Sequence, residues 1–447
     1  MTQARPGLDR VIGVGGLASV AINTIVGSGI FGLPGIAAAM LGPAAVLAYL
    51  VCALLIGLVG LCFAEAGSRV GGGGGLYAYA TESFGPVVGG IAGTLLWLAT
   101  DVVSSAAVVN LLVQTIALEI SAVGSGTGRL LMIVAVYTVL AAVNIRGVRA
   151  GTRLSLLLAV VKTAPLVLLV VAGAFFVNAA NLQVAAAPAA SQIAQASVVL
   201  FFAFMGLEGG LNVCGEVVQP ARTVPRAIFV ALVVVAALYM GLQTVAQGVL
   251  GDALRGSPVP LVALASSIMG PWGARLLFAT TLLSITGFLA ADMLGSPRVF
   301  VALAARQQLP RVLAAVHPHF KTPATAIAIY ALAAAVAALS GTFRQLVVLS
   351  TSGTLLLYLI ACLGLLRLRA RNVAAFGSCF RAPGGPLVPL AASGIIIWLL
   401  TTLRWMELLA TLAVVAASGA AYTLVEHRRK AALLSARDDA VPIVTAP

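Results

Sequence analysis

The chain has 447 residues, of which 61% are hydrophobic and only 9% are charged. Soluble proteins have about 45–50% apolar and about 25% charged residues, so an ordinary globular protein is excluded. The net charge of +13 could suggest a nucleic-acid partner, but the basic residues stand singly or in small groups at the ends of apolar runs. The composition therefore indicates a polytopic membrane protein that binds no nucleic acid.

We predict twelve membrane-spanning helices, because the apolar runs are close to the ~20 residues that cross a ~30 Å hydrocarbon layer. Continuous apolar runs favour helices over barrel strands, in which polar and apolar residues alternate. The fold class is therefore all-α. The predicted spans are residues 11–40, 43–66, 86–118, 129–146, 154–177, 193–218, 226–250, 273–297, 324–340, 344–366, 387–403 and 405–425.

The basic residues predict the orientation. Twenty of the 26 Lys and Arg residues lie on the side of the two termini, five lie on the other side, and Lys162 lies within a span. The positive-inside rule then places both termini in the cytoplasm. We expect a multi-pass protein of the plasma (inner) membrane, with a cytoplasmic N-terminus at 1–10 and a cytoplasmic tail at 426–447.

Two spans contain residues that disfavour a helix. Span 1 contains Gly27-Ser28-Gly29-Ile30-Phe31-Gly32 followed by Pro34, and each glycine costs about 1 kcal/mol relative to alanine. Span 6 is weak at Phe204–Gly210, where Glu208 also lies. If residues 11–177 and 193–366 form two repeats, followed by a pair of helices at 387–425, the two breaks occupy matching positions, which is typical of inverted-repeat transporters.

The breaks predict a chemistry. Unwound backbone at membrane depth must be buried in protein or face a water-filled cavity, so its free N–H groups can become ligand donors. The half-helix that starts near Phe31 points its positive end at the same place, which favours a carboxylate. Carbonyl groups and Glu208 in span 6 suit an ammonium group, so the pair predicts a site for an α-amino acid. The alternative is that the small residues only allow close helix packing.

At this point the residues resemble a known family. Gly27-Ser28-Gly29-Ile30-Phe31 is similar to the span-1 signature of the amino acid–polyamine–organocation (APC) permeases. Three further stretches resemble that family: 74–79 with 84–86 before span 3, 204–227 around the end of span 6, and 298–310 after span 8. The resemblance covers essentially the whole chain in order.

The resemblance implies a five-plus-five inverted-repeat (LeuT-like) core with two extra helices. It implies that substrate lies at the breaks, that spans 1, 2, 6 and 7 rock against spans 3, 4, 8 and 9, and that Phe202 forms an aromatic lid. In sodium-independent members a span-5 lysine replaces a bound sodium ion and bridges spans 1 and 8, a place that Lys162 matches. The implied carboxylate-binding backbone is that of Ser28, Gly29 and Ile30, and the implied amino-group carbonyls are those of Ile25, Phe202 and Ala203.

Ionisable residues at membrane depth cost at least ~2.5–3.5 kcal/mol each and need a reason. Lys162 is a candidate for proton coupling, although its long stem could instead carry the ammonium to the membrane surface. Glu208 resembles the glutamate of the family and is the second coupling candidate. Asp101 and Asp292 either line a subsite for a cationic side chain or form structural contacts with Lys162 or with nearby hydroxyl groups.

Other classes of function have little support. No enzyme motif stands in a plausible place, and His317-Pro-His319 is too sparse for a metal site. We therefore expect neither a cofactor nor a metal, and no enzyme activity. The sequence predicts a sodium-independent, proton-coupled secondary active amino acid transporter that works by alternating access. A cationic amino acid or polyamine exchanger (antiporter) is the alternative. The particular amino acid, symport or exchange, and the oligomeric state stay open.

Overall fold

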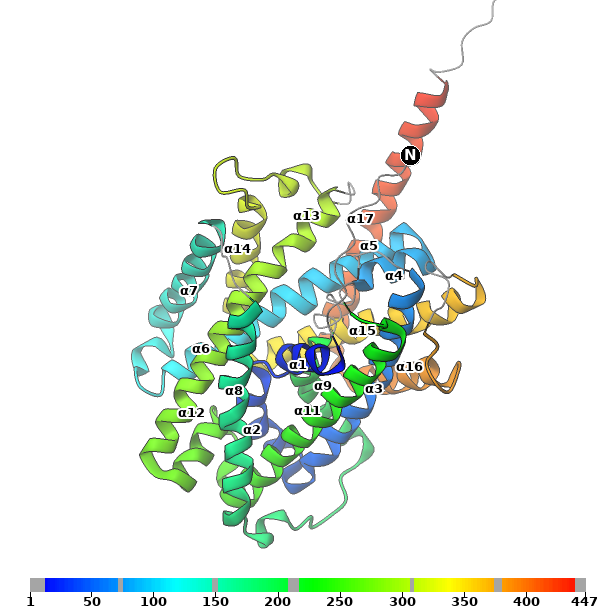
Figure 1. Cartoon of the computed structure of the whole chain (residues 1–447). Helices are drawn as coiled ribbons and strands as arrows, with labels where there is room; N and C mark the ends of the chain where they lie inside the picture. Colours follow the sequence, from blue (N-terminus) through cyan, green and yellow to red (C-terminus); the bar gives the residue numbers. More distant parts are fainter. Residues whose placement is uncertain are drawn as a thin grey trace, which may run out of the picture.

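The computed structural model describes residues 13–70, 75–146, 152–207, 217–305, 309–373 and 380–438. Within these ranges the chain is helical and contains no β-strand (Figure 1). Seven of the helical segments are long and apolar enough to cross a membrane. This architecture agrees with the all-α polytopic class predicted from the composition.

The helical segments fall into two length classes. The long apolar segments are Gly29–Val70, Pro86–Ile116, Gly126–Arg146, Arg222–Leu254, Pro260–Val301, Phe343–Ala370 and Trp405–Leu424. The shorter apolar helices are Val14–Ile25, Val161–Phe176, Ala190–Phe204, Ala324–Ser340 and Leu387–Leu400. Each predicted span overlaps one or two of these segments, but length alone does not give twelve crossings, so that number stays a prediction.

The described residues of the first half form eight α-helices. They are α1 (Val14–Ile25), α2 (Gly29–Leu41), α3 (Ala45–Val70), α4 (Gly75–Phe84), α5 (Pro86–Thr94), α6 (Ser104–Ile116), α7 (Gly126–Arg146) and α8 (Thr152–Gly173). A π-helical stretch, η2 (Leu95–Val103), joins α5 to α6 without a break. Gly85, at a φ of 93°, turns the chain between α4 and α5 just before Pro86.

The second half begins with α9 (Ala190–Phe201) and the short 3₁₀ helix η6 (Phe202–Phe204). The helices that follow are α11 (Pro220–Leu250), α12 (Pro260–Gly295), α13 (Pro297–Ala305), α14 (Ala324–Ser340), α15 (Phe343–Ala370), α16 (Leu387–Leu400) and α17 (Trp405–Asp438). The helix α12 is kinked at Gly270, whose φ of 64° and ψ of −156° are not helical and which precedes Pro271. Its longer part, after the kink, corresponds to predicted span 8.

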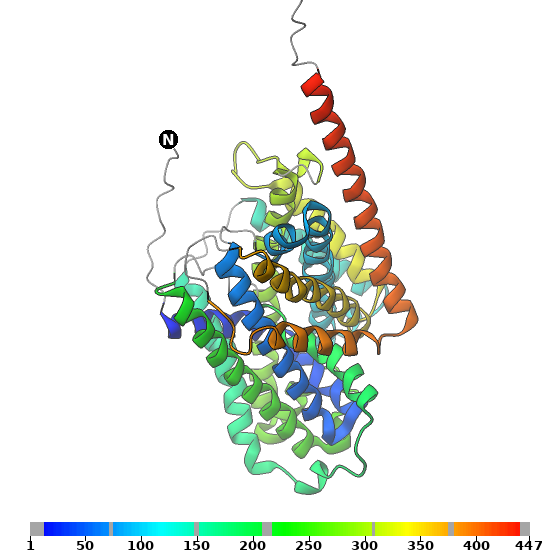
Figure 2. The same ribbon diagram turned by 90° about the vertical axis from the view of Figure 1, so that its right-hand side faces the viewer.

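The helices pack so that the first two lie inside the molecule. The helix α1 contacts α11 and α8, and α2 contacts α9, α12 and α11. The helix α3 lies against α11, α9, α15 and α16, and α6 lies between α12, α14 and α15. The last helix, α17, packs on α5 and α15 and then extends beyond the body of the molecule (Figure 2). The centre of the molecule therefore holds the break between α1 and α2.

A buried ion cluster joins the C-terminal ends of α3 and α15. Glu65 is fully buried and accepts bonds at Oε1 from Arg69 Nε (2.9 Å) and Nη2 (2.8 Å). Arg369 donates from Nε to Oε1 (2.9 Å) and from Nη2 to Oε2 (2.5 Å). The N–H of Ala382 donates to Oε2 (2.8 Å), and Arg69 Nη1 donates to the carbonyl of Val373 (3.2 Å). We call Glu65, Arg69, Arg369 and the Ala382 N–H the Glu65 cluster.

Candidate functional site

The first predicted break is present between α1 and α2. The helix α1 ends at Ile25 and α2 begins at Gly29, so Val26, Gly27 and Ser28 are not helical. Val26 and Ser28 are almost completely buried. The first N–H groups of a helix have no partner within it, and those of α2 start at this buried point. The glycines that predicted the break are the residues at which the helix stops.

The corresponding segment in the second half also leaves the α-helical path. The helix α9 ends at Phe201 and continues for one 3₁₀ turn to Phe204, and Gly206 then adopts a φ of 104°. The described chain stops at Leu207. Glu208, a predicted site and coupling residue, therefore lies outside the described residues.

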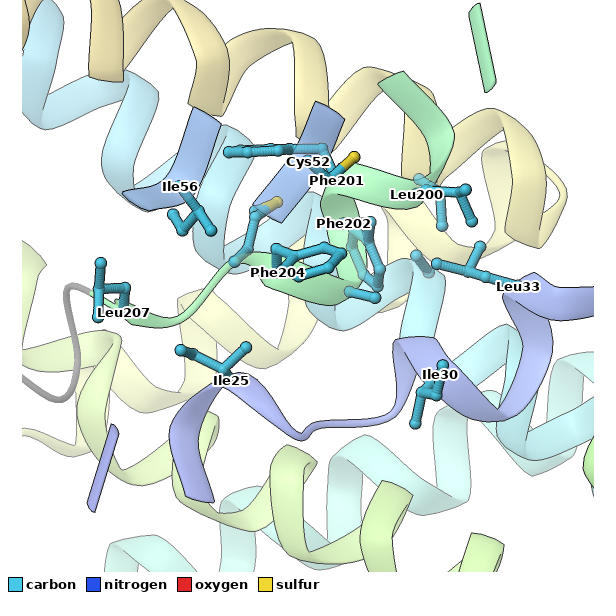
Figure 3. Packing of buried hydrophobic residues seen from close by; sticks show 14 of the residues in the cluster. Ile25, Ile30, Leu33, Cys52, Ile56, Leu200, Phe201, Phe202, Phe204 and Leu207 are labelled. Carbon is cyan, nitrogen blue, oxygen red and sulfur yellow. The ribbon is translucent and has the colours of Figure 1, made fainter. Parts of the chain in front are cut away.

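The two interrupted segments touch each other. A Cβ atom added at Gly29 would lie 3.0 Å from Ala203 Cα, 3.2 Å from Ala203 Cβ and 3.3 Å from Phe202 Cδ1. One added at Gly206 would lie 2.6 Å from the carbonyl oxygen of Thr24. Figure 3 shows the turn between Ile25 and Ile30 passing beside the segment that carries Phe202 and Phe204. Ile25, Ser28, Gly29, Ile30, Phe202 and Ala203, which the resemblance assigns to substrate, are therefore gathered at one crossing point.

A tyrosine that the sequence analysis did not single out joins the two segments. The hydroxyl of Tyr239, on α11, lies 3.1 Å from the carbonyl oxygen of Ile25 and 3.1 Å from that of Ala203. Tyr239 is fully buried, and its ring lies edge-on to that of Phe204, with centroids 5.2 Å apart. A hydroxyl group has one proton, so these two carbonyl groups share one side-chain donor; the carbonyl oxygen of Ile25 also accepts from the N–H of Gly27 at 2.7 Å. The signal in the sequence is weak: a phenol in a mostly apolar span that also contains Gln243, Thr244 and Gln247.

Two further side chains hold carbonyl groups of the first break. Lys162 Nζ, on α8, donates to the carbonyl oxygen of Asn23 at 2.7 Å. Ser284 Oγ, on α12, donates to the carbonyl oxygen of Gly27 at 3.3 Å. Lys162 thus joins span 5 to span 1, and Ser284 joins span 8 to span 1. The direct bridge from Lys162 to span 8 that the resemblance implies stays a prediction. The part of Lys162 in coupling stays a prediction.

The two predicted aspartates lie apart from this crossing point. Asp292 lies eight residues after Ser284 in α12, which corresponds to about 12 Å along the helix. Its carboxylate accepts bonds from Ser296 Oγ (2.8 Å) and from the hydroxyl of Tyr330. Asp101 lies in η2, near enough to Tyr330 for their charges to interact. Contacts with hydroxyl groups were one of the two alternatives for these residues, and their assignment to a substrate subsite stays a prediction.

The aromatic residue expected to cover the site is buried beside it. The ring of Phe202 is perpendicular to that of Phe343, with centroids 6.5 Å apart. Phe343 begins α15, so this ring pair links the sixth span to the tenth. Two turns further along α15, Ser350 Oγ donates to the carbonyl oxygen of Ala99 at 2.7 Å, and this bond fixes α15 against η2.

Comparison with known proteins identifies the family of this chain. Residues 12–425 match the amino acid permease family. The chain belongs to this family. The APC resemblance seen in the sequence is therefore confirmed, and the permease is an integral membrane protein.

Relatives from Bacillus subtilis (strain 168) match this permease over most of their length. A methylthioribose transporter is 26% identical over 443 residues, which cover 96% of this chain and 95% of the relative. The branched-chain amino acid permease BcaP is 25% identical over 423 residues, 91% of each chain. The serine/threonine exchanger SteT is 28% identical over 398 residues, 86% of this chain and 89% of the relative.

The permease site therefore combines two kinds of backbone group. The start of α2 offers N–H groups and the positive end of a helix, which suit an anion. The carbonyl groups of Ile25 and Ala203 offer acceptors, and within the described part of the chain Tyr239 is the one side chain that donates to either of them. Donors and acceptors that face one another across a short distance match the two charged ends of a zwitterion.

Proposed function

We propose that this permease is a sodium-independent, proton-coupled secondary active transporter of amino acids, which binds its substrate at the contact between the two interrupted segments and works by alternating access. The observation that supports this proposal best is the arrangement at the break. The buried start of α2 lies against Ala203, whose carbonyl group shares the Tyr239 hydroxyl with that of Ile25. Transporters with broken helices hold charged substrate groups at such helix ends.

The substrate carboxylate binds at the N–H groups of Ser28, Gly29 and Ile30 in this proposal. The ammonium group takes the carbonyl groups of Ile25, Phe202 and Ala203. The two segments are in van der Waals contact, so substrate separates them when it binds. Glu208 contributes to the site and to coupling in the same scheme.

Lys162 supports sodium independence. Its ammonium group already contacts a carbonyl group of the first span, 2.7 Å from Asn23 O. A fixed cation at such a carbonyl neutralises it in the way that a bound sodium ion would, and sodium then has no place to bind. We therefore expect uptake to be the same in sodium and in choline buffers.

The proposed architecture has twelve spans, a five-plus-five inverted repeat at 11–177 and 193–366, two further helices at 387–425, and both termini in the cytoplasm of a cell whose plasma membrane holds the protein. An amino acid exchanger is the second candidate. The name of the relative SteT supports exchange, and Asp101 together with Asp292 would favour cationic amino acids or polyamines.

The test uses purified protein in liposomes loaded with unlabelled solute. Counterflow is measured with and without sodium and after a pH step. The solutes are branched-chain amino acids, serine, threonine, arginine, lysine, a polyamine and methylthioribose. Saturable uptake of one or more amino acids, unaffected by sodium and driven by an inward proton gradient, is the expected result. Non-saturating flux would indicate a pore, strict sodium dependence would contradict the assignment of Lys162, and exchange without net uptake would favour the second candidate.

A further inference from the structure

Two carboxylates, those of Glu65 and Asp292, have opposite surroundings. Every partner of Glu65 in the cluster described above is a guanidinium or a backbone N–H group. Such groups only donate hydrogen bonds. A proton added to Glu65 would therefore meet no acceptor and would leave two arginines without their counter-ion, so the Glu65 cluster is built for a permanent charge.

Asp292 has hydroxyl partners instead. Ser296 Oγ donates to Oδ1 at 2.8 Å, the hydroxyl of Tyr330 donates to Oδ2, and the hydroxyl of Ser105 also bonds to this carboxyl group. Tyr137 donates in turn to Ser105 Oγ at 3.2 Å. A hydroxyl group can donate or accept. The same set of oxygen atoms therefore accommodates Asp292 as a carboxylate that accepts bonds or as a carboxylic acid that donates one.

Within the described ranges, Asp292 has no cationic partner. No described Lys, Arg or His forms an ion pair with it; the pairs present are Glu65 with Arg69 and Arg369, and Asp252 with Arg255. A carboxylate without a cationic partner costs free energy inside a protein. Proton uptake by Asp292 removes that cost.

The elements packed against α12 carry few charges that could compete for Asp292. α2 carries no ionisable side chain. On the other elements packed against α12, the ionisable residues with described side chains are Arg129, Tyr137 and Arg146 on α7, Lys162 on α8, Arg222, Arg226 and Tyr239 on α11, Arg298 on α13 and Tyr330 on α14. Lys162 is bonded to Asn23 O and Arg298 to Leu294 O.

A small cavity lies at the end of α12 that carries Asp292. Its volume is about 100 Å³, and its lining includes Met293, Leu294 and Arg298 of the chain after Asp292, and Ile327, one turn before Tyr330, but not Asp292 itself. Asn144 also lines it; this side chain is 95% buried, and its Oδ1 has no hydrogen-bond partner among the described residues. A buried polar atom of this kind calls for a donor, and the cavity has room for water molecules that would supply one.

We infer that Asp292 takes up a coupled proton, in addition to any proton held at Glu208 or Lys162, and that this proton enters through the Asn144 cavity. This inference rests on the proposed function, whose topology places this end of α12 toward the cytoplasm. In the step itself a hydronium ion that has passed through the cavity transfers its proton to a carboxylate oxygen of Asp292, an O–H bond forms, and a water molecule remains. Release is the reverse. Asp292 contacts no substrate in this scheme; it lies on one of the four helices, α6, α7, α12 and α14, that the hydroxyl network connects.

The test compares two kinds of transport in liposomes. Asp292→Asn should retain counterflow, which needs no coupling, and should lose both accumulation driven by a pH gradient and substrate-dependent proton entry reported by a trapped pH dye. Asp252→Asn, which removes an exposed carboxylate, is the matched control and should behave as wild type. Gradient-driven accumulation by Asp292→Asn would overturn the inference.

Two milder variants cover the case in which Asp292→Asn does not fold. Tyr330→Phe removes a donor to the charged form and should shift the pH profile of uptake toward higher pH, by about half a unit to one unit. Asn144→Leu should slow gradient-driven uptake while counterflow persists. Unchanged behaviour of both variants would overturn the inference.

The wild-type protein separates the inference from the proposed function. If it shows counterflow but no proton-driven uptake, only the inference and the proton coupling fail. If it shows no saturable counterflow, the proposed function itself fails.

Discussion

Gly29 leaves no room for a side chain where the two interrupted segments meet. A methyl group there would lie within 3.0–3.2 Å of the Cα and Cβ atoms of Ala203, closer than ordinary van der Waals contact. Forcing extra atoms into a packed site costs about 1–3 kcal/mol, and here the strain falls on the backbone that is proposed to hold substrate.

We therefore expect Gly29→Ala to lower uptake roughly tenfold or more, and the larger Gly29→Val to abolish it, while both proteins still elute as folded species in detergent. The matched control is Gly287→Ala, since a Cβ at Gly287 meets nothing within 4 Å. Uptake by Gly29→Ala equal to that of the control would remove Gly29 from the site.

The Tyr239 hydroxyl gives a second prediction at this scale. Tyr239→Phe removes the shared donor of Ile25 and Ala203 but keeps the ring against Phe204. Losing a buried hydrogen bond costs about 1–3 kcal/mol, so we expect the KM for uptake to rise roughly fivefold or more. Tyr49→Phe is the control, because the Tyr49 hydroxyl is buried nearby without a partner among the described residues. An equal effect of both variants would indicate packing alone.

Among the elements, the paired ends of α3 and α15 carry the strongest electrostatic contacts. Removing one member of a buried ion pair leaves a charge without compensation and costs roughly 3–5 kcal/mol. We expect Glu65→Ala to lower the thermal unfolding midpoint in detergent much more than Asp252→Ala, which breaks an exposed pair. The comparison should be made by following unfolding of both variants under one heating rate. Similar midpoints would show that the Glu65 cluster contributes little.

The helix break could be predicted from the sequence because its cause is local. Three glycines and a proline within eight residues disfavour helix wherever they stand, and α1 duly ends two residues before Gly27. The residues that contact the break could not be predicted from the sequence. Tyr239 and Ile25 are separated by 214 positions, and Lys162 and Asn23 by 139; which helices lie side by side decides such contacts. Composition and periodicity do not predict which helices are neighbours.

The same reason explains the aspartates. Asp292 attracts notice in the sequence as a charge at membrane depth, but its surroundings come from α6 and α14, through Ser105 and Tyr330. Its distance from the break follows from the helix rise and could have been computed from span boundaries. Its partners Ser105 and Tyr330, by contrast, become visible only when α6 and α14 are in place against α12.

For the molecule as a whole, the proposed topology predicts which connections face outward. In a variant without native cysteines, single cysteines at Ser125, Asp252 and His427 occupy exposed positions. We expect a membrane-impermeant maleimide to label the first two in intact cells and His427→Cys only after the cells are opened. Labelling of all three in intact cells would contradict the proposed twelve-span topology.

The Glu65 cluster has one more consequence, for the continuity of the polypeptide. It grips the chain on both sides of residues 374–379, at the carbonyl of Val373 and at the N–H of Ala382, while α16 packs on α3 and α15. The two parts of the chain that this segment joins covalently are thus also held together by non-covalent contacts. Two fragments divided at this junction should therefore associate when they are co-expressed. The transport activity restored in such cells would measure the strength of these non-covalent contacts.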